Sequence, residues 1–107
     1  MSANGEAIVL TGTGGAGGMV EGQVWRKESG PMVPGAIIVA HMTEPTMLDE
    51  MLRASAVVTD IGGAMCHAAL VCMEAGIPYI VGTREATTHL NDGDWVRVDP
   101  STKTVTK

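Results

Sequence analysis

The histidine His67 follows a pair of glycines and precedes an apolar run over 68–73, with no helix-breaking residue before Gly76. Gly62 and Gly63 let the backbone turn sharply and approach another group closely, because they carry no Cβ. A glycine turn that leads into a helix leaves the first N–H groups of that helix unpaired, and the helix dipole adds positive charge there. Anions bind at such places. His67 therefore suggests a ring nitrogen that receives a phosphoryl group, although a histidine that only hydrogen-bonds locally fits the same spacing.

Phosphoryl transfer through histidine needs a neutral imidazole nitrogen and donors that hold the group without trapping it. We expect those donors to be backbone N–H groups of the glycine turn and of the first helical residues. The residues expected to bind phosphate are Gly62, Gly63, Cys66, Ala68 and Ala69, with His67 as the reacting residue.

Cysteine and metal chemistry are the alternatives in the same region. Cys66 adjoins His67 near a helix start, where a thiolate is favoured, so a nucleophilic thiol is conceivable beside a passive role. A zinc set is also conceivable, but no pair of candidate ligands has the spacing of a known zinc finger, and we expect no metal site. His41 and His89 are expected to be surface or loop histidines. The candidate ligands are His41, Cys66, His67, Cys72 and His89.

Short strands alternating with helices would position His67. The apolar segment 36–40 is too short for a helix and follows Pro-Gly, which favours a buried strand, and 56–59 is a second one. The carboxyl end of 56–59 delivers the glycine turn, and ligands of open α/β sheets gather beyond such strand ends. Met and Leu recur at helical spacing from Met47 to Leu52, as core packing requires. Further strands are expected at 7–11, 19–25, 77–82, 95–99 and 104–106, a second helix at 68–75, and a loop or short helix at 83–90.

The glycine-rich segment 12–18 invites comparison with nucleotide-binding loops. It has no Gly-Lys-Ser/Thr ending, and the residues that follow, 19–25, have the pattern of a strand and not of a helix. We therefore expect a loop without a phosphate-binding role of its own.

The residues around His67 also resemble a known signature. The matching segments are Gly62–Val71, Gly76–Gly82 and Leu90–Asp99. Together they are similar to the phosphohistidine signature and closing hairpin of the phosphoenolpyruvate-utilising enzymes. That family includes pyruvate phosphate dikinase, phosphoenolpyruvate synthase, enzyme I of the sugar phosphotransferase system and rifampin phosphotransferase. The resemblance covers most of the chain.

The resemblance implies an α/β fold, the swivelling β/β/α domain, as a single compact domain over residues 1–107. It implies that His67 carries a phosphoryl group to an acceptor, a small molecule or pyruvate, held by an acceptor-binding protein. The donor would be ATP or phosphoenolpyruvate with Mg²⁺, bound by a partner such as an ATP-grasp protein, and the domain itself would bind no cofactor. Because these partner domains do not fit in 107 residues, we expect a stand-alone phosphotransferase component that is incomplete without them.

Two further residues are expected to support the site by the same resemblance. Asp60 precedes the two glycines at a place where the family often has Glu, and we expect it to hydrogen-bond the loop. A capping role and a catalytic role are equally open for it. Thr43 lies in a Thr43-Glu44-Pro45 segment that resembles the family's Thr-Thr-Pro. There Thr would cap the next helix and Pro45 would lie in its first turn.

Three residues depart from the family's pattern. Met65 replaces a hydroxyl residue, Ala64 replaces a residue that is often basic or polar, and Met73 replaces a basic residue of the helix. Each lost charge-assisted bond weakens phosphate binding by about 1 kcal/mol or more. Either the partner supplies these groups, or the chain is a non-catalytic assembly or binding module that retains the swivelling fold. The apolar strip of Ala64, Met65, Leu70 and Met73 would be the docking face.

The composition limits the classes of partner and compartment. The net charge is −5 without a Lys/Arg cluster, which argues against nucleic acids and anionic membranes as partners. No apolar run approaches the ~20 residues that span a bilayer, and no signal-peptide pattern is visible, so we expect a cytoplasmic protein. Cys66 and Cys72 would lie on different faces of one helix, which disfavours a disulfide.

Overall fold

The computed structural model of the chain describes residues 8–107, and three short apolar segments form its parallel centre: β4 (Ile37–Ala40), β5 (Ala56–Thr59) and β6 (Tyr79–Val81). The strand β5 lies in the middle and pairs with β4 on one side and with β6 on the other. All side chains of these strands except that of Ala40 are buried, because layers cover both faces.

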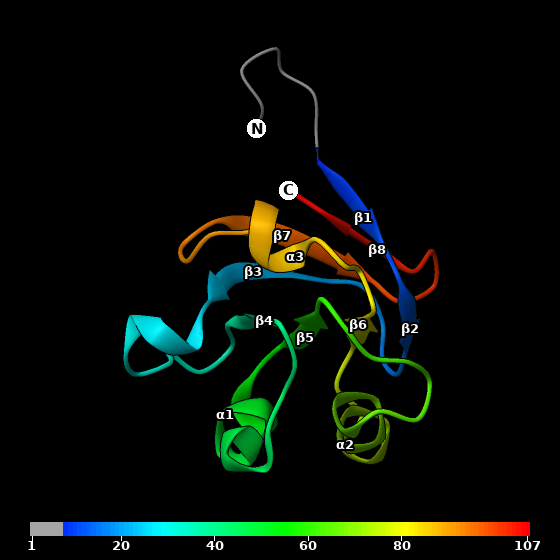
Figure 1. Cartoon of the computed structure of the whole chain (residues 1–107), viewed down its shortest axis with the longest axis horizontal. Coiled ribbons are helices and arrows are strands. Elements are labelled where there is room, and N and C mark those ends of the chain that lie inside the picture. The colour runs from blue at the N-terminus through cyan, green and yellow to red at the C-terminus, as the bar shows by residue number, and fades with distance from the viewer. Residues whose placement is uncertain (1–7) are drawn as a thin grey trace.

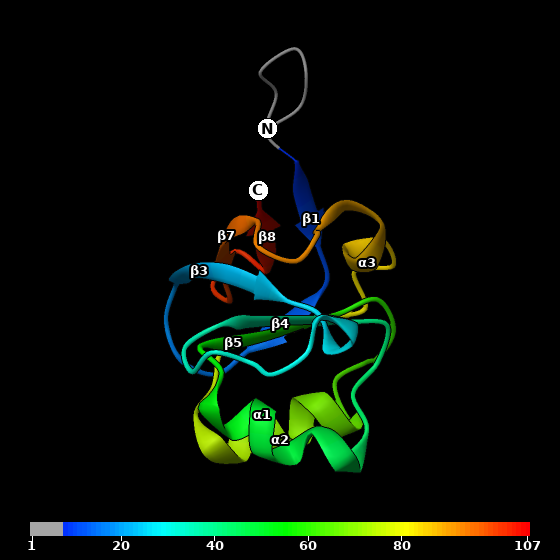
Figure 2. The ribbon, with the colours of Figure 1, turned by 90° about the vertical axis from the view of Figure 1, so that its left-hand side faces the viewer.

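Two helices cover one face of these strands (Figures 1 and 2). They are α1 (Leu48–Arg53), which continues the 3₁₀ turn η2 (Pro45–Met47), and α2 (His67–Ala75). Gly76 ends α2 in the left-handed conformation, at φ 74°, as its sequence position predicts. The buried side chains of this layer are Trp25, Met32, Ile38, Met47, Met51, Val57, Ala68, Ala69, Cys72, Ile77, Tyr79 and Val81.

Antiparallel strands form a second layer on the opposite face. Strand β3 (Val20–Trp25) joins the layers, since it pairs parallel with β4 and antiparallel with β7 (Trp95–Asp99). Beyond β7 come β8 (Thr104–Thr106) and β1 (Val9–Thr11), and the short helix α3 (Ala86–His89) contributes to the same core. A 3₁₀ turn, η1 (Lys27–Ser29), follows β3. The buried side chains between the layers are Leu10, Val24, Ile37, Val39, Ala56, Val58, Ile80, Ala86, Leu90, Val96, Val98 and Val105.

Gly12 links β1 to the next strand of the chain, and these two strands lie at opposite edges of the sheet. The order is β1-β8-β7-β3-β4-β5-β6-β2, and β2 (Thr13–Gly15) follows β1 in sequence after this single glycine. A Cβ at Gly12 would lie 2.3 Å from the Val81 carbonyl oxygen, and one at Gly14 would lie 2.4 Å from Ile80 Cδ1. Strand β2 can pair with β6 only because these positions lack side chains. The expectation of a loop over 12–18 was therefore wrong for residues 13–15, since glycine-rich strands give no strand signal in sequence.

The two ends of the described chain lie side by side. Lys107 N–H donates to the Ile8 carbonyl at 2.9 Å, and Val9 pairs with Thr106. The Lys107 ammonium group also lies 2.9 Å from an Asp94 carboxylate oxygen and donates to the His89 carbonyl at 3.1 Å. These contacts anchor the last residue to the strand layer that lies opposite α1 and α2.

The α/β class, the single compact body and the β/β/α layering predicted from sequence are confirmed. The strand expected at 7–11 covers Val9–Thr11, and Ala7 lies outside the described residues. The strand expected at 77–82 is shorter, and the segment 83–90 does contain a short helix. Among residues 8–107, no helix has the length and apolar character needed to span a bilayer.

Candidate functional site

The loop between β5 and α2 depends on one of its two glycines. Gly62 has a φ of +131°, and a Cβ there would lie 2.8 Å from Cys66 Sγ. The neighbouring segment approaches equally closely, because a Cβ at Gly82 would lie 2.7 Å from the Gly62 carbonyl oxygen. A Cβ at Gly63 would meet nothing within 4 Å. The loop conformation therefore requires glycine at position 62, whereas position 63 has room for a side chain.

Helix α2 begins at His67, with Cys66 as an extended N-cap residue whose side chain makes no capping bond. The Leu70 N–H donates to the Cys66 carbonyl at 3.0 Å, so the N–H groups of His67, Ala68 and Ala69 precede this first helical bond. The Cys66 N–H donates to the Gly63 carbonyl at 3.1 Å. This bond closes the turn, and the expected role of Cys66 in binding phosphate stays a prediction.

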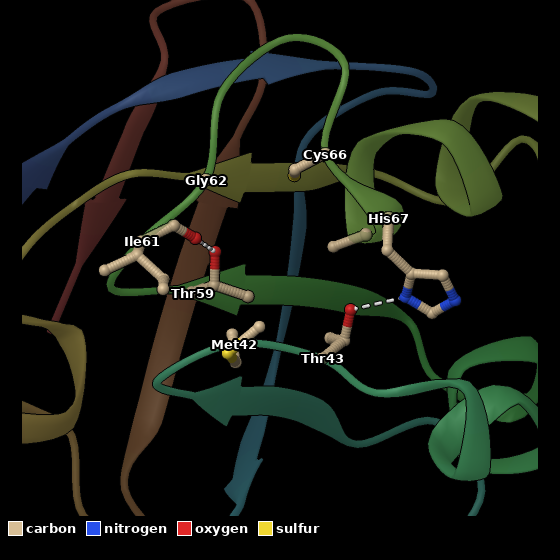
Figure 3. A pocket seen from close by; sticks show the side chains of 8 residues that line it. Met42, Thr43, Thr59, Ile61, Gly62, Cys66 and His67 are labelled. Atoms are coloured by element: carbon tan, nitrogen blue, oxygen red, sulfur yellow. Dashed lines mark hydrogen bonds between the residues drawn. The ribbon is translucent and has the colours of Figure 1, made fainter.

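A pocket of about 150 Å³ opens at the start of α2, beyond the carboxyl ends of β4 and β5 (Figure 3). The sequence predicted five of the lining residues and missed Met42, Thr59 and Ile61. These three follow or end the two parallel strands, a position that could have identified them. The lining residues are Met42, Thr43, Thr59, Ile61, Gly62, Cys66, His67 and Ala68.

Thr43 and His67 meet inside this pocket. Thr43 Oγ1 lies 2.9 Å from His67 Nδ1, and the other ring nitrogen, Nε2, faces away from Thr43 (Figure 3). The expected helix cap at Thr43 is wrong: Glu44 occupies the N-cap position of η2 without a side-chain capping bond, while Pro45 lies in the first turn as expected. The Thr43 hydroxyl is buried against the histidine because β4 and β5 are parallel neighbours, whose following loops emerge on the same side.

Asp60 lies outside the pocket lining and joins three segments. Its Oδ1 accepts the Thr87 N–H at 2.8 Å, and its Oδ2 accepts the Thr87 hydroxyl and lies 3.1 Å from His41 Nδ1. Although burial raises the pKa of Asp60, the bonds from Thr87 and His41 hold it below its ordinary value. The bond from the Thr87 N–H is made in the first turn of α3, and a catalytic role of Asp60 stays a prediction.

The other histidines and cysteines do not form a metal site. His41 is exposed and bound to Asp60, while His89 Nε2 lies 3.9 Å from a Glu85 carboxylate oxygen. In the described part of the chain, no three His, Cys, Asp or Glu side chains are placed to share a metal ion. Both cysteines are free thiols, and burial raises the pKa of Cys72 to about 12.

Comparison with known families matches residues 32–103 to the PEP-utilising enzyme, mobile domain, family. The chain belongs to this family. A probable phosphoenolpyruvate synthase from Archaeoglobus fulgidus is 46% identical over 96 residues, which are 86% of this chain and 13% of that protein. The mobile domain described here thus spans about an eighth of the length of that relative.

Solved structures support the fold of this mobile domain. The solution structure of Enzyme I is 25% identical, with a TM-score of 0.60, and the match covers 69% of this chain and 31% of that one. Aconitase X from Thermococcus kodakaraensis has a TM-score of 0.70 at 18% identity, covering 92% and 96% of the two chains. The second likeness concerns the fold alone.

Proposed function

We propose that this mobile domain is a phosphoryl carrier whose His67 is transiently phosphorylated on Nε2. The contact between Thr43 Oγ1 and His67 Nδ1 carries the proposal. A histidine whose Nδ1–H donates to a fixed oxygen keeps its lone pair on Nε2, which is the tautomer that attacks phosphorus. Family membership and the position of His67 at the start of α2 support the same function.

The transfer step follows from this tautomer. The Nε2 lone pair attacks phosphorus, the Nε2–P bond forms, and the bond from phosphorus to the donor's leaving group breaks with its electron pair on that group. The ring keeps its Nδ1 proton, hydrogen-bonded to Thr43 Oγ1, and becomes cationic until that proton leaves. The N–H groups of Ala68 and Ala69 and the positive end of α2 would stabilise the phosphoryl oxygens. Transfer to an acceptor oxygen reverses the roles.

The donor and the acceptor would be bound by partners. We propose that an ATP-grasp protein holding ATP with Mg²⁺, or a protein holding phosphoenolpyruvate, phosphorylates His67, and that a second partner holds the acceptor, a small molecule or pyruvate. In this proposal the domain carries the phosphoryl group between these partners in the cytoplasm. The relative from Archaeoglobus fulgidus, a probable phosphoenolpyruvate synthase by name, supports phosphoenolpyruvate as one of the molecules that the partners bind.

Reaction of the pure protein with phosphoramidate, a small phosphoryl donor, tests the proposal without a partner. Intact mass and site mapping should show rapid single addition at His67, stable in alkali and lost in acid. His67→Ala should show no such addition, and His41 and His89 should remain unmodified. Slow labelling of all three histidines would instead favour the assembly module, for which the exposed Met65, Leu70 and Met73 are the supporting observation.

A further inference from the structure

Three hydrogen bonds tie the start of the connection between β4 and α1 to the residues that follow β5. The Asp60 N–H donates to the Ala40 carbonyl at 3.1 Å, and the Ile61 N–H donates to the His41 carbonyl at 3.0 Å. The third bond is made by side chains, since His41 Nδ1 lies 3.1 Å from Asp60 Oδ2. The position of this connection therefore depends on one side-chain contact as well as on the backbone.

The buried carboxylate of Asp60 is itself fixed by the first turn of α3. Its Oδ1 accepts the Thr87 N–H at 2.8 Å, and its Oδ2 accepts the Thr87 hydroxyl. Although burial raises the pKa of Asp60, the bonds from Thr87 and His41 hold it below its ordinary value, so the carboxylate is ionised at neutral pH. An ionised carboxylate only accepts hydrogen bonds, and Nδ1 of His41 therefore carries the proton and donates.

The same connection contacts the reacting histidine two residues later. Thr43 is buried, and its Oγ1 lies 2.9 Å from His67 Nδ1. Two residues span at most about 7 Å, so the segment has little freedom between its bonds to Asp60 and its contact with His67. A displacement of His41 is therefore passed on to Thr43 Oγ1. The side chain of His41 is 67% exposed and adds little to the core, so its bond to Asp60 is its structural contribution.

We propose that His41 is a positioning residue for phosphoryl transfer at His67. Anchored to the Asp60 carboxylate, it fixes the segment that carries Thr43. Thr43 Oγ1 then accepts the Nδ1 proton of His67, which keeps the lone pair on Nε2. His41 and Asp60 do not line the pocket, so they act on the reaction through Thr43 and touch no reacting atom. The inference rests on the carrier function proposed above.

Two replacements of His41 separate its hydrogen bond from the bulk of its side chain. His41→Leu removes the donor, and it should slow phosphoramidate labelling of His67 by about threefold, since the two backbone bonds remain. His41→Asn keeps an N–H group at the place of Nδ1 and should restore the wild-type rate. His89→Leu is the matched control, because the ring of His89 pairs with Glu85 and should not affect labelling. Equal losses in His41→Leu and His41→Asn would overturn the inference.

A double-mutant cycle tests whether His41 acts through Thr43. In a Thr43→Val background, His41→Leu should cause no further loss of rate, because the oxygen that it positions is already absent. If the losses instead multiply, about fivefold from Thr43→Val and about threefold from His41→Leu, the two residues act independently and the inference is wrong.

The tautomer of His67 gives a readout that needs no phosphoryl donor. ¹⁵N NMR of the ring should show less of the Nδ1–H form in His41→Leu and the wild-type proportion in His41→Asn. If wild-type His67 is not labelled but its tautomer responds in this way, the carrier function fails while the positioning role stands. If His67 is labelled at one rate in all variants and its tautomer does not change, the positioning role fails while the carrier function stands.

Discussion

Thr43 Oγ1 lies 2.9 Å from His67 Nδ1, although the two residues are 24 positions apart and follow different strands. The register of β4 and β5, in which Ala40 pairs with Thr59, brings the two loops together. The contact between the Thr43 hydroxyl and the His67 ring therefore depends on how the two strands pair, and not only on the histidine's own loop. The first prediction depends on this relationship.

Replacing Thr43 with valine should slow the phosphorylation of His67. Valine keeps the shape of the buried side chain but removes the oxygen that accepts Nδ1–H in the proposed tautomer, which should cost about 1 kcal/mol or roughly fivefold in rate. The rate of labelling by phosphoramidate measures the effect, and ¹⁵N NMR of the ring should show a loss of the Nδ1–H tautomer. Thr46→Val is the matched control, because Thr46 is exposed and should give wild-type values.

Replacing Asp60 with asparagine should lower the stability of the domain at neutral pH by about 1–3 kcal/mol, since a buried charged acceptor for Thr87 and His41 is lost. The pKa of Asp60 is lowered from 3.8, so its stabilising effect is present above that value and is lost as the pH falls through the folded-state pKa. The difference between wild type and variant in urea unfolding should therefore narrow below about pH 3.8.

The exposed pair of Asp49 and Arg53 provides the control for that experiment. Asp49→Asn removes a 2.8 Å surface ion pair and should change the free energy of unfolding by less than about 0.5 kcal/mol at any pH. A gap between wild type and Asp60→Asn that stays constant from pH 7 to pH 3 would contradict the assigned role of the ionised carboxylate.

Alanine at Gly62 and at Gly63 should have opposite outcomes. Gly62→Ala must accommodate a φ of +131° and a Cβ 2.8 Å from Cys66 Sγ, so we expect a loss of about 1–3 kcal/mol and reduced labelling of His67. Gly63→Ala meets open space and should stay within about 0.5 kcal/mol of wild type. Thermal or urea unfolding of the two variants decides the matter. Equal destabilisation would show that the loop adopts another conformation in solution.

The two thiols should differ in reactivity. Cys72 is fully buried and burial raises its pKa to about 12, whereas Cys66 is half-buried at the pocket. Iodoacetamide should modify one thiol in the native protein and both after unfolding, and Cys66→Ser should abolish the native reaction. The added group would fill part of the pocket, so modified protein should be phosphorylated slowly at His67. Native modification of Cys72 would contradict the packing of α2.

Much of the fold could be predicted from local pattern. Buried parallel strands are continuous apolar runs, so 36–40 and 56–59 were recognisable, and Gly76 marked the end of α2. Strand β2 was missed because its glycines are needed for close approach to β6, a tertiary requirement that leaves no strand signal in Thr13–Gly15.

The site residues that belong to one loop could be predicted from sequence. The contacts between residues of different segments could not. His67 and Gly62 belong to one loop and were identified from it. The side chains that hold His67 and Asp60 come from other segments, and pairing of Thr43 with His67, or of His41 with Asp60, depends on strand register. The helix cap at Thr43 was predicted from the neighbouring residues alone. The prediction failed because the partner of Thr43 is His67, which follows a different strand.

The hydrogen bond from Lys107 to Ile8 has a mechanical consequence. A polypeptide that continued on both sides of this domain would enter and leave at neighbouring points, on the side of the molecule opposite α2 (Figures 1 and 2). The domain could then rotate as one body about its two neighbouring ends. His67, at the start of α2, lies on the side of the domain away from those ends. A rotation about these ends would displace the histidine farther than it displaces β1 and β8, and it would leave the strand pairs intact.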